Sequence, residues 1–577
     1  MRMFILIARA FFCIPLVSTL IAADRDPATL MPPGTIVYAE IPDPPRLLST
    51  VFDHPLAEAV QETEPWKQAT QRDGYRAFLA GRKFAEIQLG MDWRTALDTL
   101  AAKGISFGVH AESRGVVVVI RAKDAESLQL LREKLLAMNL LGPEKDRFRQ
   151  GDHRGIPAWD NGKLKFAVKE DLLVITNKSA TGTMVLDRLL DEGTATLADN
   201  PNFQAARETR PADTSVWAFA DLATLREAGA AKKLFAGESE NPAAELLFGG
   251  ILSNLQHTPH AAASLSVTNG GLDLQLSVPG NSEWIPEERS FYFGPDGHGP
   301  APALPDIRNT LFTLSAYRDI SEMWLRAGDL FNERINDGIA EADANLTTLF
   351  AGRDFGEDIL GAITPQVAFV ASRQDFTDVL PAPAIRLPQF ALVLKLRDPE
   401  KMTRELRRTF QSMIGFFNVL GAMQGNPQLE LNMKQIDDAE LITSTYIPEE
   451  DDADSADAGI FFNFSPSVGF NRDRFVVAST SRLAQELVQA QLRDTPADGV
   501  NTTMQLHADV LHDVLNDNRK HLVARNMLED GNSPEEAEAT IGLLLQFLSY
   551  YRDLSLELVN RNDRISVQVS LRLQETR

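Results

Sequence analysis

The sequence has 577 residues, of which 44% are hydrophobic and 24% charged, and its formal net charge is −23 at pH 7. At about 100 to 200 residues per domain this length indicates two to four domains, and the composition excludes disordered, collagen-like and polytopic membrane proteins. Because the excess of acids repels phosphate backbones, we expect no nucleic-acid partner, and anionic lipid headgroups are disfavoured unless the fold hides a basic patch.

The first 23 residues have the pattern of a secretory signal peptide. Arg2 and Arg9 supply positive charge, an apolar run follows, and the small residues Ala22 and Ala23 come before the first acid. We expect cleavage near Ala23, export to the periplasm or the medium, and no membrane-spanning segment afterwards. The alternative is a retained membrane anchor, although the uncharged run is short and contains a proline.

Cys13 lies in this N-terminal segment and is the only cysteine of the chain. The mature protein would therefore contain no cysteine, which excludes disulfides, thiol catalysis, iron–sulfur clusters and thiolate zinc sites. Exported domains with a small core commonly need disulfides, so a cysteine-free chain is expected to have a core that is stable without them.

The predicted elements occur in the same order twice along the chain. The matching segments are 33–48 with 309–321, 90–109 with 352–371, 116–135 with 390–410, 166–190 with 468–487, and 215–276 with 503–569. Alternating apolar and polar residues in the strands predict antiparallel sheets with one buried face, and the Asn- and Gly-containing turns at 268–271 and 560–563 predict hairpins. A linker rich in glycine and proline, residues 294–302, separates the two copies.

We therefore predict an exported α+β protein with an internal duplication. Its first half would span residues 24–304 and its second half residues 305–577. Each half is expected to be a mainly antiparallel sheet with amphipathic helices packed on one face. The sequence leaves open whether the two sheets pair edge to edge or face to face.

Four aspartates mark predicted helix starts at equivalent places in the two halves. Asp92 and Asp354 precede aromatic residues, and Asp124 and Asp398 follow predicted strands. A short carboxylate at this position accepts a hydrogen bond from a free backbone N–H of the first turn. These residues are interpreted as caps rather than as catalytic acids.

The plan resembles one of the exported bacterial families that are catalogued only as a domain of unknown function. The similar features are the opening at residues 30–38 with Asp43 and Pro44 after it, the helix start at residues 90–93, and the strand-to-helix steps at Asp124 and Asp398. The resemblance covers most of the mature chain and implies an exported α+β protein. It implies no catalytic residues.

Histidine pairs are the first candidates for a metal site, because imidazole binds metals and titrates near neutrality. His257 and His260 lie close together beside a proline, and His507 and His512 lie between a strand and a helix. Neither pair has a third ligand at a recognised spacing, so we expect exposed or hydrogen-bonded histidines and no metal or other cofactor.

Two acidic segments also have structural interpretations. Residues 449–457 hold the densest charge but lack the order of an EF-hand loop, so a solvated insertion is favoured over a calcium site. In residues 529–536, Gly531 would end one helix, and Ser533 with Glu536 would cap the next one.

Residues 415–423 form an apolar stretch at the end of the helix that starts at Asp398. It is apolar on nearly all sides, so it is either buried between the halves or part of an apolar groove, and burial is the favoured interpretation. The candidate residues for a ligand or interface are Phe416, Phe417, Leu420 and Met423.

The sequence contains no recognised catalytic motif. We therefore expect a non-catalytic binding or structural protein of the bacterial cell envelope, whose partner would be a protein, peptide or lipid meeting the apolar helix and the open sheet faces. The alternative is a periplasmic hydrolase with a carboxylate-based site, which requires a desolvated acid or histidine in a cleft.

Overall fold

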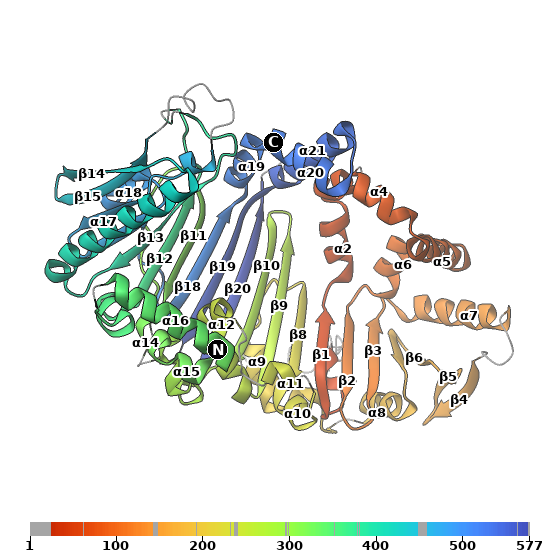
Figure 1. Ribbon diagram of the computed structural model, residues 1–577. Coiled ribbons are helices and arrows are strands. Elements are labelled where there is room, and N and C mark those ends of the chain that lie inside the picture. The colour runs from red at the N-terminus through yellow and green to blue at the C-terminus, as the bar shows by residue number, and fades with distance from the viewer. Residues whose placement is uncertain are drawn as a thin grey trace, which may run out of the picture.

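The computed structural model describes residues 25–574, except 62, 142–147, 192, 231, 236–240, 295–296, 298, 351, 378, 380, 448–458 and 562. Figure 1 shows one long curved sheet with helices at its ends and along its margins. No helix in these residues has the length and hydropathy needed to cross a membrane.

The elements follow one another in two similar series. The strands of the first half are β1 (Thr35–Ile41), β2 (Ile105–His110), β3 (Gly115–Arg121), β4 (Arg149–His153), β5 (Ile156–Asp160), β6 (Lys165–Lys169), β7 (Leu172–Thr176), β8 (Val216–Asp221), β9 (His260–Thr268) and β10 (Gly271–Pro279). Those of the second half are β11 (Thr310–Tyr317), β12 (Gln366–Ser372), β13 (Gln389–Lys395), β14 (Leu429–Ile436), β15 (Ala439–Tyr446), β16 (Ser467–Asn471), β17 (Arg474–Ala478), β18 (Val500–His507), β19 (Tyr551–Arg561) and β20 (Arg564–Leu573).

The helices are distributed over both halves. In the first half they are α2 (Pro44–Phe52), α3 (Pro55–Gln61), α4 (Glu64–Gln71), α5 (Asp73–Leu89), α6 (Trp93–Leu100), α7 (Ala125–Leu141), α8 (Ser179–Leu190), α9 (Pro201–Glu208), α10 (Leu222–Glu227), α11 (Lys232–Phe235), α12 (Pro242–His257) and α13 (Ser290–Phe293). In the second half they are α14 (Ile320–Leu325), α15 (Ala327–Leu330), α16 (Glu333–Leu349), α17 (Pro399–Gln424), α18 (Ser481–Gln489), α19 (Ala508–Asp517), α20 (Arg519–Asp530) and α21 (Pro534–Ser549).

The strands pair in the same order in the two halves. The first half has the order β4-β5-β6-β7-β3-β2-β1-β8-β9-β10, with every neighbouring pair antiparallel. The second half has the order β14-β15-β16-β17-β13-β12-β11-β18-β19-β20, also antiparallel throughout. The fold class is α+β, as the sequence predicts. A common strand order is what an internal duplication requires, but the duplication itself stays a prediction.

The two halves join edge to edge through β10 and β20, which pair antiparallel from Gly271 opposite Arg572 to Pro279 opposite Arg564. Gln275 lies opposite Gln568, and each is the fifth residue of its strand. The two hairpins β9–β10 and β19–β20 therefore meet in a locally twofold arrangement. This contact decides the question that the sequence left open and makes one continuous sheet.

Local sequence signals explain where several helices begin. Asp92 accepts hydrogen bonds from the first turn of α6, and Asp398 does the same for α17. Asp354 caps the π-helical turn Phe355–Ile359, and Asp124 accepts the backbone N–H of Ser127 in α7. The interpretation of these four aspartates as caps is confirmed.

Helices cover both faces of the outer strands, so the expectation of helices on one face is only partly correct. In the second half, Phe410 and Ile414 of α17 pack on one face, together with Leu394 of β13. Leu483 and Leu487 of α18 pack on the other face. The first half has the same arrangement, with α7 and α8 on opposite faces. Strands near the two ends of the sheet are apolar on both sides, which is why they need two layers of helix.

Buried polar side chains connect the helices of the first half to the second half. Arg318 follows β11, and its guanidinium lies 3.6 Å from the ring centroid of Tyr292 and 2.7 Å from Oδ1 of Asn501. It also donates to the carbonyl of Leu246 in α12. Burial lowers the pKa of Arg318 and raises the pKa of Tyr292 to about 12.

Candidate functional site

One side of the central sheet carries apolar side chains on strand after strand. A row of directly opposed residues crosses nine neighbouring strands from β8 to β13: Val216, Leu265, Leu274, Val569, Leu556, Met504, Leu314, Phe369 and Leu392. A second row consists of Val267, Leu272, Leu571, Leu554, Leu506, Phe312, Ala371 and Phe390. The rows lie two residues apart on each shared strand and therefore on the same side. We call this side the open face.

The open face is accessible to solvent. Leu554, Phe390 and Leu392 are 41%, 44% and 40% exposed, and except for Ala371 the other residues of the two rows are partly exposed. α7 and α17 pack on this side at the two ends of the sheet. Helices α12 to α16 pack on the same side at one margin, against Val278, Leu558, Ile565 and Val567, and Figure 1 shows them in front of that end of the central strands. The residues of the two rows lie beyond these helices. At the usual strand spacing of about 4.8 Å, nine strands span roughly 40 Å. Soluble monomers seldom expose continuous apolar surface on this scale, so the open face is a candidate binding surface.

The opposite side of the same central strands is polar. Glu557 and Gln568 point away from the open face and are exposed. Asp273 accepts hydrogen bonds from Ser570 and from the guanidinium of Arg572 on the neighbouring strand. The central strands are therefore amphipathic, and their apolar side is covered by α12 to α16 at one margin and partly exposed along the two rows.

The chemistry of the open face restricts what it can recognise. The backbone N–H and C=O groups of its strands pair with neighbouring strands on both sides, from β8 to β13. The side chains of both rows are aliphatic, aromatic or thioether groups, which offer no strong hydrogen-bond donor or acceptor. An occupant of this surface gains stability from apolar contact and from the removal of water.

The four apolar residues predicted on α17 are exposed, so the favoured interpretation of burial between the halves is wrong. Phe416, Phe417, Leu420 and Met423 are 56%, 42%, 40% and 80% exposed. The halves join through β10 and β20, whereas the end of α17 is held by Asn418, whose side chain bonds the backbone of Leu429 on the edge strand β14. The packed side of this helix ends at Ile414, which contacts the sheet near one end of the open face.

The histidine pairs do not form a metal site. His260 is 6% exposed and burial lowers its pKa, while His257 stacks on Trp284. Nδ1 of His507 lies 2.7 Å from Asp553, and Nδ1 of His512 lies 3.2 Å from Asp513. Within the residues that the structure describes, no group of three or more His, Cys, Asp or Glu side chains is placed to hold a metal.

The structure describes one of the two acidic segments, residues 529–536. The run at residues 449–457 lies outside the described residues. At residues 529–536, Gly531 ends α20 with φ 71°, and Ser533 and Glu536 form a capping box at the start of α21. The prediction of two abutting helices is confirmed there, and these carboxylates have structural partners.

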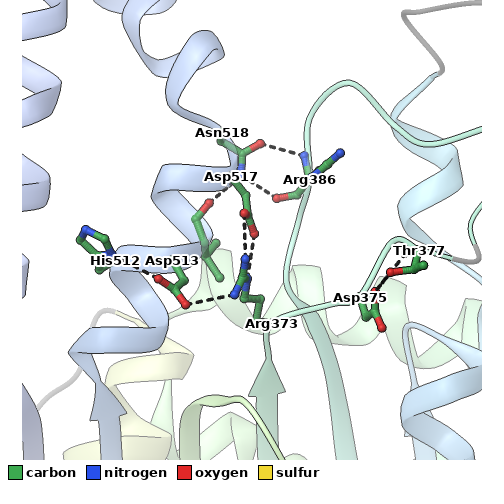
Figure 2. A network of polar contacts seen from close by, with 9 residues as sticks. Arg373, Asp375, Thr377, Arg386, His512, Asp513, Asp517 and Asn518 are labelled. Carbon is green, nitrogen blue, oxygen red and sulfur yellow. Dashed lines mark hydrogen bonds and ion pairs between the residues drawn. The ribbon is translucent and has the colours of Figure 1, made fainter.

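A polar network holds the loop after β12 against α19 (Figure 2). Arg373 binds Asp517 with both ends of its guanidinium, at 2.8 and 2.9 Å, and lies 3.0 Å from Asp513. The backbone of Arg386, in the same loop, exchanges two hydrogen bonds with the side chain of Asn518. A polar hollow of about 380 Å³ lies beside these residues. Because its acids are paired with arginines, the network fastens the loop to α19.

Sequence reasoning found the alternation of the strands but not the open face. Alternation at 263–267, 272–276, 554–558 and 565–569 showed that each of these strands has an apolar side. It did not show that these sides align across nine strands. The signal that could have indicated the open face was that consecutive hairpins each have an apolar side.

Comparisons with known proteins place the chain in no family. No known protein family matches the sequence, and no curated protein matches it either. Among solved structures, crystal form III of TP0453 is similar to part of this chain, with 11% identity and a TM-score of 0.24, covering 44% of this chain and 79% of TP0453. Crystal form I of the same protein gives 12% identity and a TM-score of 0.23. Similarity at this level supports no inference about function.

Proposed function

We propose that this protein is an exported, non-catalytic binding protein of the bacterial cell envelope and that its open face binds the acyl chains of lipids. The open face itself carries this proposal, because its two rows of apolar side chains cross up to nine strands and are partly exposed to solvent. Export rests on the signal-peptide pattern of the first 23 residues.

Acyl chains fit the chemistry of this surface better than a peptide does. A peptide that adds to a sheet binds through its backbone, and the free strand edges of this sheet are at β4 and β14, away from the open face. On the open face the backbone groups are already paired, so a peptide main chain would lose its hydrogen bonds to water without replacement. Acyl chains have no such groups to satisfy.

The charge of the protein suggests which headgroups it accepts. The formal net charge of −23 repels anionic headgroups. We therefore propose zwitterionic lipids as the preferred ligands. The hydrolase alternative requires a desolvated acid or histidine in a cleft. Each carboxyl shift resolved among the described residues is downward, as for Asp187 beside His153 and Asp273 beside Arg572, and the groups whose pKa burial lowers include His110 and His260.

The test measures transfer of pyrene-labelled phosphatidylcholine from phosphatidylcholine vesicles to the protein, followed by separation of protein and vesicles. Leu554→Asp places a charge on the open face, where burial against an acyl chain is costly, and should weaken binding at least about tenfold. Leu528→Asp is the matched control, because Leu528 is an 87% exposed leucine of α20 outside the two rows. It should leave binding unchanged.

Two results would contradict the proposal. One is equal lipid binding by the Leu554→Asp variant and the wild-type protein, with both folded by circular dichroism. The other is a dimer in light scattering that Leu554→Asp converts to a monomer, which would show that the open face is covered by a second copy of this chain.

A further inference from the structure

A separate pocket lies in the first half, on the side of the sheet opposite to the open face. It has a volume of about 600 Å³ and is enclosed by strands β4 to β7 and by the first two turns of α8. Its floor is apolar and buried, with Ala167, Val174 and Leu186 4%, 3% and 4% exposed. A volume of this size with an apolar floor is typical of small-molecule sites.

The equivalent place in the second half has about half this volume, 310 Å³. The strand register identifies the counterparts: Ala158 lies opposite Ala167 in the first half, and Leu441 lies opposite Gly469 in the second. At three lining positions the first half has the smaller residue. The pairs are Gly151 and Lys434, Ala158 and Leu441, and Thr183 and Gln485.

These differences explain why the pocket of the first half is the larger and the more apolar of the two. Leu441 is 1% exposed and packs with Leu483 and Val488 of α18, so it fills the space above its strand. Ala158 is smaller than its counterpart Leu441 and leaves the pocket wider beside α8.

Most polar groups at the mouth of the pocket already have partners, and Arg149 is the exception that the proposal uses. Asp152 and Asp160 already accept the backbone N–H groups of Gly155 and Gly162, and Asp160 also lies 3.3 Å from Nζ of Lys165. Arg149 forms no ion pair with any residue that the structure describes.

The start of α8 provides further donors. Its N-cap, Lys178, provides no side-chain hydrogen bond, whereas Thr480 caps the equivalent helix α18 by accepting the N–H of Leu483. The backbone N–H groups of the first turn of α8 therefore have no side-chain cap, and Ser179 of this turn lines the pocket. A negatively charged group would satisfy these donors together with Arg149.

We propose that this pocket binds a small organic anion with an apolar ring or short chain, the ring on Ala158, Val174 and Leu186 and the anionic group near Arg149. This site is independent of the open face, which lies on the other side of the sheet. The failure of one proposal leaves the other standing.

The experiment titrates the full-length exported protein with 2-naphthoate and, separately, with the neutral 2-naphthol, by isothermal titration calorimetry. Ala158→Leu introduces the residue of the second half and should weaken 2-naphthoate binding at least about tenfold. Arg149→Gln should weaken binding of 2-naphthoate and leave that of 2-naphthol unchanged. Leu554→Asp, on the open face, should affect neither ligand.

Several outcomes would overturn the proposal. If 2-naphthoate does not bind the wild-type protein, or binds the Ala158→Leu variant equally well, the pocket is not a ligand site. If Leu554→Asp abolishes binding, the aromatic probe occupies the open face instead. Equal affinity for 2-naphthol and 2-naphthoate would overturn the assignment of an anionic ligand. Arg149 lies on an exposed edge strand, so its variant keeps the test valid if Ala158→Leu folds poorly.

Discussion

Replacement of Glu245 by glutamine should destabilise this protein more than any change on its surface. Glu245 of α12 is fully buried, and Arg289 is 6% exposed. The guanidinium of Arg289 meets both carboxylate oxygens, at 2.6 and 3.0 Å, and its remaining nitrogen lies 2.8 Å from Oγ of Ser253. This pair fixes α12 to the turn that leads into the second half.

The expected loss in free energy of unfolding follows from the burial of the Glu245–Arg289 pair. Glu245→Gln removes the negative charge that faces a buried cation, and a glutamine amide would direct a donor at the guanidinium. Breaking a buried pair in this way costs about 3 to 5 kcal/mol, whereas replacing both partners by apolar residues of similar size is about neutral or stabilising. The double variant Glu245→Leu with Arg289→Met should therefore recover most of the free energy of unfolding that the single variant loses.

Urea unfolding at pH 7, followed by circular dichroism, measures both variants against the wild type. The reasoning would be refuted if Glu245→Gln lost less than about 1 kcal/mol, which is the range of an exposed ion pair. It would also be refuted if the double variant were less stable than the single one, since the carboxylate would then not be the source of the cost.

Two further predictions concern the second half. Hydrogen bonds from Thr377, together with the ion pair to Arg482, lower the pKa of Asp375 to about 2, so its stabilising contribution is present above about pH 4 and is lost as the pH falls towards 2. A carbon-detected NMR titration should give this midpoint and a higher one in Thr377→Val, and a wild-type midpoint at the usual value of 3.8 would contradict it. Ser533→Ala removes the cap of α21 and should cost about 1 kcal/mol, measured as faster amide exchange in its first turn, and unchanged exchange would count against the capping role.

Much of the local structure could be predicted from the sequence because its causes are local. Asp92 and Asp398 cap their helices as their positions before apolar helical patterns indicate. The turn at residues 268–271 closes the hairpin β9–β10, as its composition indicates. The order of elements in the two halves could also be predicted, because hydrophobic periodicity and turn residues act over a few positions.

The site was less predictable. The apolar end of α17 was correctly identified as unusual, but Phe416 and Met423 are exposed rather than buried between the halves. Whether an apolar helix face is covered depends on which other elements reach it. The halves meet through β10 and β20, and this contact leaves α17 at the far end of its own half.

The sequence by itself determined that each central strand has one apolar and one polar side, because side-chain direction alternates along an extended backbone. Only the tertiary structure decided that nine such strands align their apolar sides, as Leu274 and Val569 do across the junction. It also decided that helices cover this side at its ends and at one margin, and leave the two rows partly exposed. Amphipathicity is a property of a few consecutive residues. Burial is set by contacts between segments hundreds of residues apart, and no local pattern specifies which of these form.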